Sequence, residues 1–222
     1  MTYLFLFLSV AIGYIIALLF KIKEVGQIAM FLAFSGAFLL SITIFELLPE
    51  VYQVPSKTIG VYIISGILLQ IFLDFFSQGA EHGHIHNHKT KNLFPWLLFI
   101  SLSIHALFEG FPISEDNNLM IGVIVHKIPI ALILSVFFIK ANYSKTMTIL
   151  FLFLFALMTP AGSWISTNFE VVQVYKTQIT AITIGIFLHV STTILFESAK
   201  NHKFNLSKMT VVILAIVIAY FL

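Results

Sequence analysis

Eight uninterrupted apolar runs occupy most of this sequence and leave only short segments between them. The runs are residues 2–20, 27–48, 58–77, 93–111, 119–139, 146–165, 180–196 and 209–222. A helix needs about 20 apolar residues, with a range of about 17–25, to cross the hydrocarbon core of a bilayer. The first seven runs fall in that range, and the last is shorter. The runs therefore predict an all-α polytopic membrane protein with eight transmembrane helices, or seven if the last run does not cross.

The composition agrees with a membrane protein. Hydrophobic residues make up 59% of the chain and charged residues 10%, against about 45–50% and 25% in soluble domains. These values exclude a disordered chain and argue against a soluble enzyme or a nucleic-acid-binding protein. The runs are too long, and too continuously apolar, for the strands of a β-barrel. We expect one transmembrane domain over residues 1–222. Without cysteine, there is neither a disulfide nor a thiolate metal ligand.

Lysine placement predicts the orientation. The chain has no arginine, and nine of its lysines fall in alternate loops on one side of the predicted membrane. They are Lys21, Lys23, Lys89, Lys91, Lys140, Lys145, Lys200, Lys203 and Lys208. Cytoplasmic loops are enriched in lysine, so both termini are predicted outside and the longest loop, 78–92, in the cytoplasm. The bias toward lysine, isoleucine and phenylalanine is typical of AT-rich bacterial genomes and favours a plasma (inner) membrane location.

Seven ionisable side chains fall within the apolar runs. Each costs about 2.5–3.5 kcal/mol at the centre of a membrane helix, so each needs a partner or a function. They are Glu46, Asp74, His105, Glu109, His126, Lys127 and His189. Asp74 lies near the cytoplasmic end of its run, where solvation can account for it.

His105 and Glu109 are the strongest candidates for a metal site. Residues four apart share a helix face, with Cβ atoms about 5–6 Å apart. An imidazole and a carboxylate at that spacing suit Zn²⁺, Fe²⁺, Mn²⁺ or Co²⁺. Gly110 lets a neighbouring helix approach closely, and His126 lies at a similar depth one run later, where it can supply a third ligand. The alternative is a buried structural hydrogen bond between His105 and Glu109.

Prolines suggest interrupted helices near this site. Pro129 follows His126 by three residues, and Pro160 lies within the sixth run. Proline lacks an N–H and removes one helical hydrogen bond, and broken helices near the midplane are common in transporters. We therefore expect helix breaks at both positions.

Two other intramembrane groups have more than one interpretation. His189 has Thr192 and Thr193 nearby, which favours a structural histidine over a metal ligand. Lys127 needs a buried anionic partner, and both Glu109 and Glu46 are available.

The longest loop contains alternating histidines. The segment Glu81 to His88 places His82, His84, His86 and His88 at every second position. Histidine-rich tracts of this kind bind metal, so the loop is predicted to accept or sense metal on the cytoplasmic side. The alternative is a solvated loop with incidental histidines.

Four motifs together resemble the ZIP (Zrt/Irt-like) family of divalent metal transporters. The specific ones are HALFEG at 105–110 and IVHKIP at 124–129, and GAFLLSITIFELLPE at 36–50 and MTPAG at 158–162 agree with them. The resemblance implies a ZIP-like bundle of eight spans with both ends outside. It also implies a metal path between spans 2, 4, 5 and 7, with His105, Glu109 and His126 as mid-membrane ligands.

Three departures from the family pattern bear on the site. Ile130 stands where the family usually has a glutamate shared by two metals, and Glu46 stands where its second span usually has histidine. In span 7, Ile194 replaces an acidic residue, and His189 stands where an aromatic residue is common. These departures imply a site for one metal, in which Lys127 supplies the charge of the second. Glu46 or His189 then replaces the lost ligand.

We therefore expect a transporter of a divalent cation, and the resemblance implies that it moves the cation into the cytoplasm by alternating access. Zinc is the first choice, with iron, manganese or cadmium as other substrates. The chain is not expected to be an enzyme or to need a catalytic cofactor. Its expected partners are the cation and the lipid bilayer, and a homodimer is compatible with them. The main alternative is an integral membrane metalloenzyme, such as a lipid hydrolase. A haem protein with two axial histidines and an ion-coupled carrier of an organic solute are further alternatives.

Overall fold

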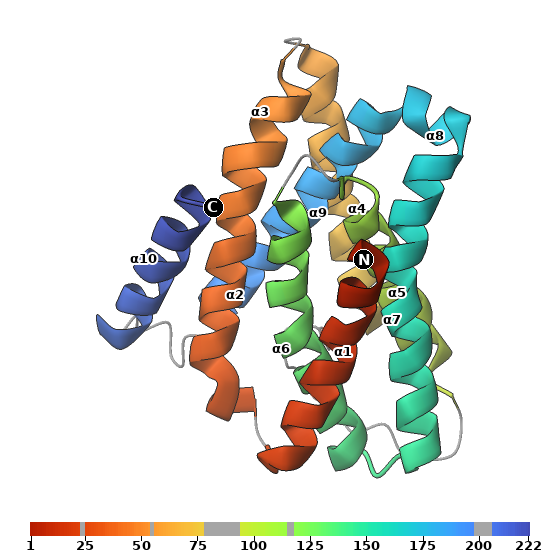
Figure 1. Cartoon of the computed structure of the whole chain (residues 1–222), viewed down its shortest axis with the longest axis vertical. Helices are drawn as coiled ribbons and strands as arrows, with labels where there is room; N and C mark the ends of the chain where they lie inside the picture. Colours follow the sequence, from red (N-terminus) through yellow and green to blue (C-terminus); the bar gives the residue numbers. More distant parts are fainter. Residues whose placement is uncertain (23–24, 54–55, 78–93, 115–117, 198–205) are drawn as a thin grey trace.

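A computed structural model describes the whole chain except residues 23–24, 54–55, 78–93, 115–117 and 198–205. Every regular element in the described residues is a helix (Figure 1), as the apolar runs predict. The elements are α1 (Thr2–Leu19), η1 (Val25–Ile28), α2 (Ala29–Ile42), the π-helical turn η2 (Thr43–Leu47), α3 (Leu48–Val51), α4 (Lys57–Ser77), α5 (Trp96–Gly110), α6 (Leu119–Lys140), α7 (Lys145–Asn168), α8 (Glu170–Val174), α9 (Lys176–Glu197) and α10 (Leu206–Tyr220).

Within the described ranges, six helical segments are long and apolar enough to cross a membrane. They are Thr2–Leu19, Ala29–Val51, Lys57–Ser77, Leu119–Lys140, Lys145–Asn168 and Lys176–Phe196. The remaining two apolar runs form the shorter helices α5 and α10. All-helical architecture is confirmed, whereas eight crossings and their orientation stay predictions.

The long helices pack as two groups. The first bundle contains α1, α5, α6 and α7, and the second bundle contains α2, α4, α9 and α10. The two bundles meet mainly where α2 lies against α6 and where α4 lies against α5. In Figure 1, α10 lies beside α2 at the left, and α1, α6 and α7 occupy the front and right. Side chains on these two contacts therefore link the bundles.

Glycine pairs bring the backbones together inside each bundle. A Cβ built on Gly185 of α9 would lie 2.9 Å from the Cα atom of Gly66 in α4. A Cβ built on Gly110 of α5 would lie 3.0 Å from the Cα atom of Gly162 in α7. Membrane helices associate through close van der Waals packing, which small residues permit. The close approach predicted at Gly110 is confirmed.

Several buried hydroxyl groups bond a carbonyl of their own helix. Ser41 donates to the carbonyl of Ala37 at 2.8 Å, and Ser135 donates to that of Ala131 at 2.6 Å. A hydroxyl bonded to the carbonyl four residues earlier needs no partner from another helix. Most serines and threonines of the apolar runs can therefore be buried without forming a polar site.

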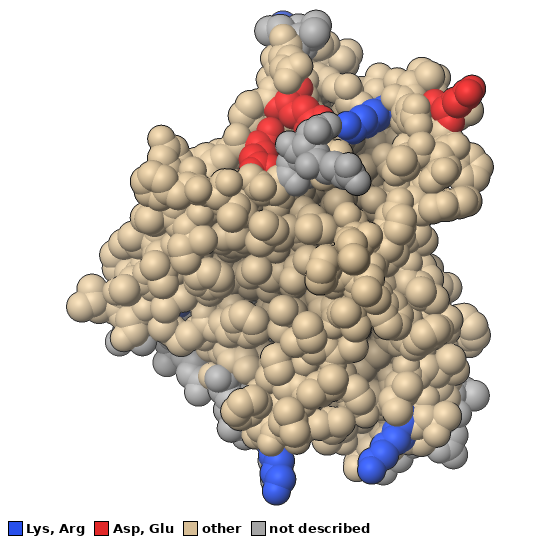
Figure 2. Space-filling model, viewed as in Figure 1, with Lys and Arg blue, Asp and Glu red and all other residues tan. Residues whose placement is uncertain are grey.

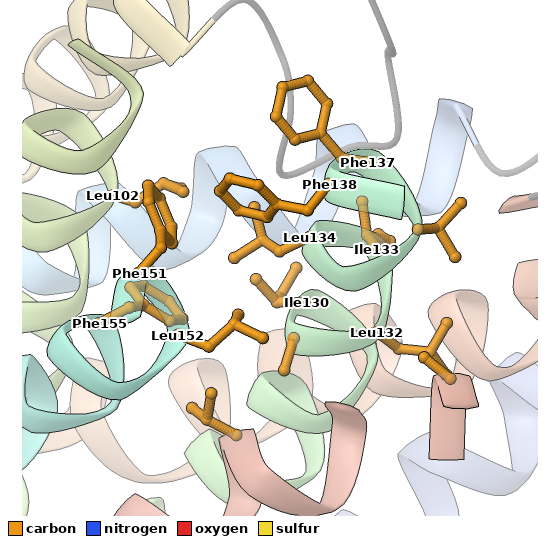
Figure 3. Packing of buried hydrophobic residues seen from close by; sticks show 14 of the residues in the cluster. Leu102, Ile130, Leu132, Ile133, Leu134, Phe137, Phe138, Phe151, Leu152 and Phe155 are labelled. Carbon is orange, nitrogen blue, oxygen red and sulfur yellow. The ribbon is translucent and has the colours of Figure 1, made fainter. Parts of the chain in front are cut away.

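One face of α6 packs into an apolar core. In Figure 3, the side chains of Ile130, Leu134 and Phe138 point from α6 toward α7. Phe151 and Leu152 of α7 belong to the same apolar cluster. The rings of Phe138 and Phe151 lie 4.7 Å apart between centroids. Ile130 is 4% exposed, so the position where the family usually carries a glutamate belongs to the hydrophobic core of this chain.

The outer surface is apolar around the middle of the molecule. Figure 2 shows a wide uncharged band, with acidic side chains at its upper end only and lysines at both ends. Large apolar residues are also exposed on α4, where Leu68 is 62% exposed and Phe75 is 76% exposed. Soluble monomeric proteins rarely expose so large an apolar surface to water. Such a surface suits contact with the hydrocarbon core of a bilayer.

The expected helix breaks at the prolines are absent from this part of the structure. Pro129 lies inside α6 and Pro160 inside α7, and both helices continue through them. Packing on neighbouring helices holds such a helix together although one backbone hydrogen bond is lost. The irregular turn comes elsewhere, at η2, directly before the α3 segment that contains Pro49.

Candidate metal site

Helix α5 places His105 and Glu109 one turn apart on the same face, as their spacing predicts. The Nε2 atom of His105 lies 3.0 Å from Oε1 of Glu109. His105 is 3% exposed and Glu109 is 1% exposed. A carboxylate this deep in an apolar protein requires compensating charge.

Helix α6 brings that compensation from the other side. The Nζ atom of Lys127 lies 2.7 Å from Oε2 of Glu109, and Nε2 of His126 lies 3.8 Å from Oε1. The Lys127 ammonium also lies 4.5 Å from the centre of the Phe155 ring, a cation–π contact. Of the two predicted partners for Lys127, the structure therefore selects Glu109.

The two oxygens of Glu109 have different surroundings. Oε1 faces the Nε2 atoms of both His105 and His126. Oε2 contacts the Lys127 ammonium and is also 3.2 Å from the hydroxyl of Thr159 in α7. Oε2 is thus held by the ammonium and the hydroxyl, and Oε1 faces the two imidazole rings.

The spacing of these atoms fits a metal ion. His105, Glu109 and His126 each offer a ligand atom, and the three atoms lie within 4.8 Å of one another. A tetrahedral zinc ion held at about 2.0–2.1 Å from its ligands separates them by about 3.3 Å. The two distances to Oε1, 3.0 and 3.8 Å, lie on either side of that value. Small side-chain rotations would complete the geometry.

A hydrogen-bonded chain leads from His105 into the second bundle. Nδ1 of His105 lies 2.9 Å from Oε1 of Gln70 in α4, and Nε2 of Gln70 donates to Oδ1 of Asp74 at 2.7 Å. Oδ2 of Asp74 lies 2.8 Å from Nε2 of His189 in α9. Solvation alone therefore does not account for Asp74. The hydroxyl of Thr193 donates to the backbone carbonyl of His189. This hydrogen bond does not involve the His189 ring, whose partner is Asp74.

Glu46 lies apart from the cluster. Its Oε2 accepts from the backbone N–H of Asn118 at 2.9 Å, and its Oε1 accepts from the Asn118 side-chain amide at 3.0 Å. Asn118 is the N-cap of α6, where a carboxylate interacts favourably with the helix dipole. Of the predicted ligands, the structure brings together His105, Glu109 and His126, and holds Glu46 and His189 on other partners.

Some functional candidates fall outside the described residues, and others escaped the sequence analysis. The loop histidines His82, His84, His86 and His88 lie in the segment that the structure does not describe. Gln70 and Thr159 were missed because both are uncharged and lie within long apolar runs. For Gln70 the sequence did offer a clue: a side-chain amide is rare within an apolar run and suggests a buried hydrogen-bond partner.

The family comparison covers the part of the chain that holds the candidate ligands. The sequence model of the family described as "ZIP Zinc transporter" matches residues 77–221, which include α5, α6 and α7. The chain belongs to this family. Membership points to a multi-pass membrane transporter rather than an enzyme, which argues against the lipid hydrolase alternative.

Two curated relatives match shorter parts of the chain. "Zinc transporter ZIP1" of Danio rerio is 30% identical over 89 residues, which is 37% of this chain and 30% of the relative. "Protein zntD" of Dictyostelium discoideum is 32% identical over 104 residues, which is 39% of this chain and 15% of the relative. The matched part thus spans less than a third of either relative.

Proposed function

We propose that this protein carries a divalent metal cation, zinc first, through the membrane into the cytoplasm. His105, Glu109 and His126 are the proposed mid-membrane ligands. The metal is the transported substrate and not a catalytic cofactor. The proposal draws on the family membership and on the buried cluster of the three ligand atoms.

The arrangement around Glu109 carries the proposal. Lys127 and Thr159 hold Oε2, while Oε1 faces two imidazole nitrogens, each of which can donate a hydrogen to Oε1 or present a lone pair to a metal ion. Three ligands leave a fourth position for water or an exchanging group, as in open zinc sites. Such a site can release its ion, which transport requires.

A single metal is proposed, because Lys127 holds the side of Glu109 where a second cation would bind. Its ammonium is 2.7 Å from Oε2, so a second divalent ion there would meet a positive charge at contact distance. Ile130 offers no carboxylate and packs in the apolar core. We expect the double variant Lys127→Ala, Ile130→Glu to gain a second bound zinc ion.

Alternating access fits the two-bundle architecture. The proposed ligands all lie in the first bundle, and that bundle meets the second mainly through α2 on α6 and α4 on α5. A shift of one bundle against the other would open the site to either side while its ligands stay together. The lysine distribution supports a cytoplasmic position for loop 78–92, and the family resemblance implies inward transport.

Zinc flux into proteoliposomes tests the proposal. The purified protein is reconstituted with a zinc-responsive dye trapped inside, and His105→Ala is compared with Ser101→Ala. Ser101 is one turn earlier on α5, and its hydroxyl bonds the carbonyl of Leu97 in its own helix. We expect flux from wild type and Ser101→Ala, and none from His105→Ala.

Metal counting separates transport from binding. The difference in bound zinc between wild type and His105→Ala isolates the mid-membrane site from metal held by the histidine-rich segment. A difference of one ion supports the proposed site. Equal flux from wild type and His105→Ala would overturn the site, and bound zinc without flux would overturn the transport function.

A further inference from the structure

We propose that Gln70, oriented by Asp74, is a positioning residue that fixes the tautomer of His105. The proposal rests on the proposed function, in which His105 is a metal ligand. Neither side chain is among the proposed ligands. Gln70 is fully buried at 0% exposure and lies in α4, outside the bundle that holds the ligands.

The order of donors and acceptors along the chain carries the inference. An ionised carboxylate only accepts hydrogen bonds, so Asp74 requires the amide nitrogen of Gln70 to face it, at 2.7 Å. The amide oxygen of Gln70 then faces Nδ1 of His105, at 2.9 Å. Since that oxygen only accepts, Nδ1 must carry the hydrogen.

This order leaves Nε2 of His105 as the metal-binding nitrogen. Nε2 is the atom that points at Oε1 of Glu109, 3.0 Å away. With the hydrogen fixed on Nδ1, a cation between Nε2 and Oε1 meets two lone pairs. Partners that hold the second nitrogen of a ligating histidine commonly contribute a factor of about 10–100 in metal affinity.

The far end of the chain strengthens the orientation. The second oxygen of Asp74 lies 2.8 Å from Nε2 of His189. The side chains of His189 and Asp74 are 21% and 17% exposed, so this pair is partly shielded from water. Both oxygens of Asp74 therefore have a partner, and the carboxylate is held in the position that orients Gln70.

Three substitutions separate this role from a purely structural one. Gln70→Leu removes the acceptor for Nδ1. Asp74→Asn lets the amide at residue 74 present either its oxygen or its NH₂ group, so the order is no longer imposed. Gln70→Glu combined with Asp74→Asn restores it, because the new carboxylate accepts from both Nδ1 of His105 and the amide of residue 74. Ser65→Ala is the matched control on the same helix, since the Ser65 hydroxyl donates to the carbonyl of Val61 one turn earlier, at 2.8 Å.

Two measurements test the proposal on the full-length protein. Zinc affinity is measured by competition with a chelating dye. The Nδ1–H signal of His105 is followed by nitrogen-15 NMR on histidine-labelled protein, with and without zinc. We expect Gln70→Leu to bind zinc about 10–100-fold more weakly and to lose the protected Nδ1–H signal. Asp74→Asn should lie between, and the double variant should recover both properties.

The outcomes distinguish this inference from the proposed function. An unchanged Nδ1–H signal in Gln70→Leu, or unchanged zinc affinity, would overturn the positioning role. Weak binding by the double variant together with a restored signal would also overturn it. Failure of the metal site itself would show as equal zinc binding by wild type and His105→Ala, and the signal in metal-free protein is independent of that result.

Discussion

The contact between α5 and α7 beside Glu109 should be intolerant of a single methyl group. In Gly110→Ala, the new Cβ would lie 2.7 Å from the backbone nitrogen of Ser163 and closer still to the Thr159 carbonyl. Ordinary van der Waals contact begins at 3.4 Å, so α5 and α7 would have to part by at least 0.7 Å. Both neighbours are backbone atoms and cannot rotate away.

That displacement would reach the metal site through Thr159. Its hydroxyl lies 2.9 Å from the Ala106 carbonyl and 3.2 Å from Oε2 of Glu109. A rigid shift of this size along those lines gives about 3.6 and 3.9 Å, beyond hydrogen-bond range. Overpacking costs about 1–3 kcal/mol, and a hydrogen bond to a charged group contributes about 1.5–3 kcal/mol. Together these give an expected loss of about 2.5–6 kcal/mol in stability, with weaker zinc binding.

Gly122→Ala is the matched control for this prediction. Gly122 lies on α6, one turn before His126, and the nearest neighbours of its added Cβ would be Ile42 side-chain atoms at 3.5–3.6 Å, an ordinary van der Waals contact. Alanine also has the higher helix propensity, so this variant should be as stable as wild type or more so. Thermal unfolding in detergent and zinc flux in proteoliposomes are measured for both variants. If Gly110→Ala matches Gly122→Ala in both assays, the helices are not held together as the structure has them.

Three further predictions concern charge at and near the site. Lys127→Met leaves the Glu109 carboxylate without its cation, so the metal-free protein should lose about 3–5 kcal/mol of stability. Added zinc should restore part of this loss, which thermal unfolding with and without zinc would show. Equal melting points of the variant in both conditions would contradict the prediction. Glu46→Gln weakens the cap at Asn118 and should cost about 0.5–2 kcal/mol without changing the number of bound zinc ions, whereas loss of one ion would identify Glu46 as the ligand that the sequence suggested. Zinc uptake should fall in acid, because an imidazole that carries a hydrogen on both nitrogens has no lone pair for the metal; uptake that rises steadily into acid would refute metal binding through neutral imidazoles.

Helical periodicity and motif spacing predicted the part of the site that lies within one or two helices. His105 and Glu109 are four residues apart, and residues at that spacing lie on the same face of a helix. The single hydrophobic environment of a membrane span likewise made each ionisable residue conspicuous. Gly110 was predicted as a point of close helix approach for the same local reason, and the short contact with Gly162 bears this out.

Long-range partners were not predictable in the same way. Glu46 and Glu109 were equal candidates for Lys127, and only the packing of α5 against the other helices brought Glu109 within 2.7 Å. The predicted helix breaks at the prolines were wrong for a related reason. Pro129 removes a backbone hydrogen bond wherever it occurs, but tertiary packing decides whether the helix then bends or continues, and α6 continues.

The sequence by itself determined that this chain is a bundle of apolar helices with a histidine–carboxylate pair on one of them. Hydrophobic length and a spacing of four residues are local properties, and they hold whichever helices become neighbours. Tertiary structure alone decided which side chains from other helices surround that pair. Gln70 lies 35 residues from His105 and Thr159 lies 50 residues from Glu109, and no local pattern specifies contacts at such separations. The donors and acceptors that orient the site therefore became visible only in the tertiary structure, Thr159 through packing within the first bundle and Gln70 through packing of the second bundle against it.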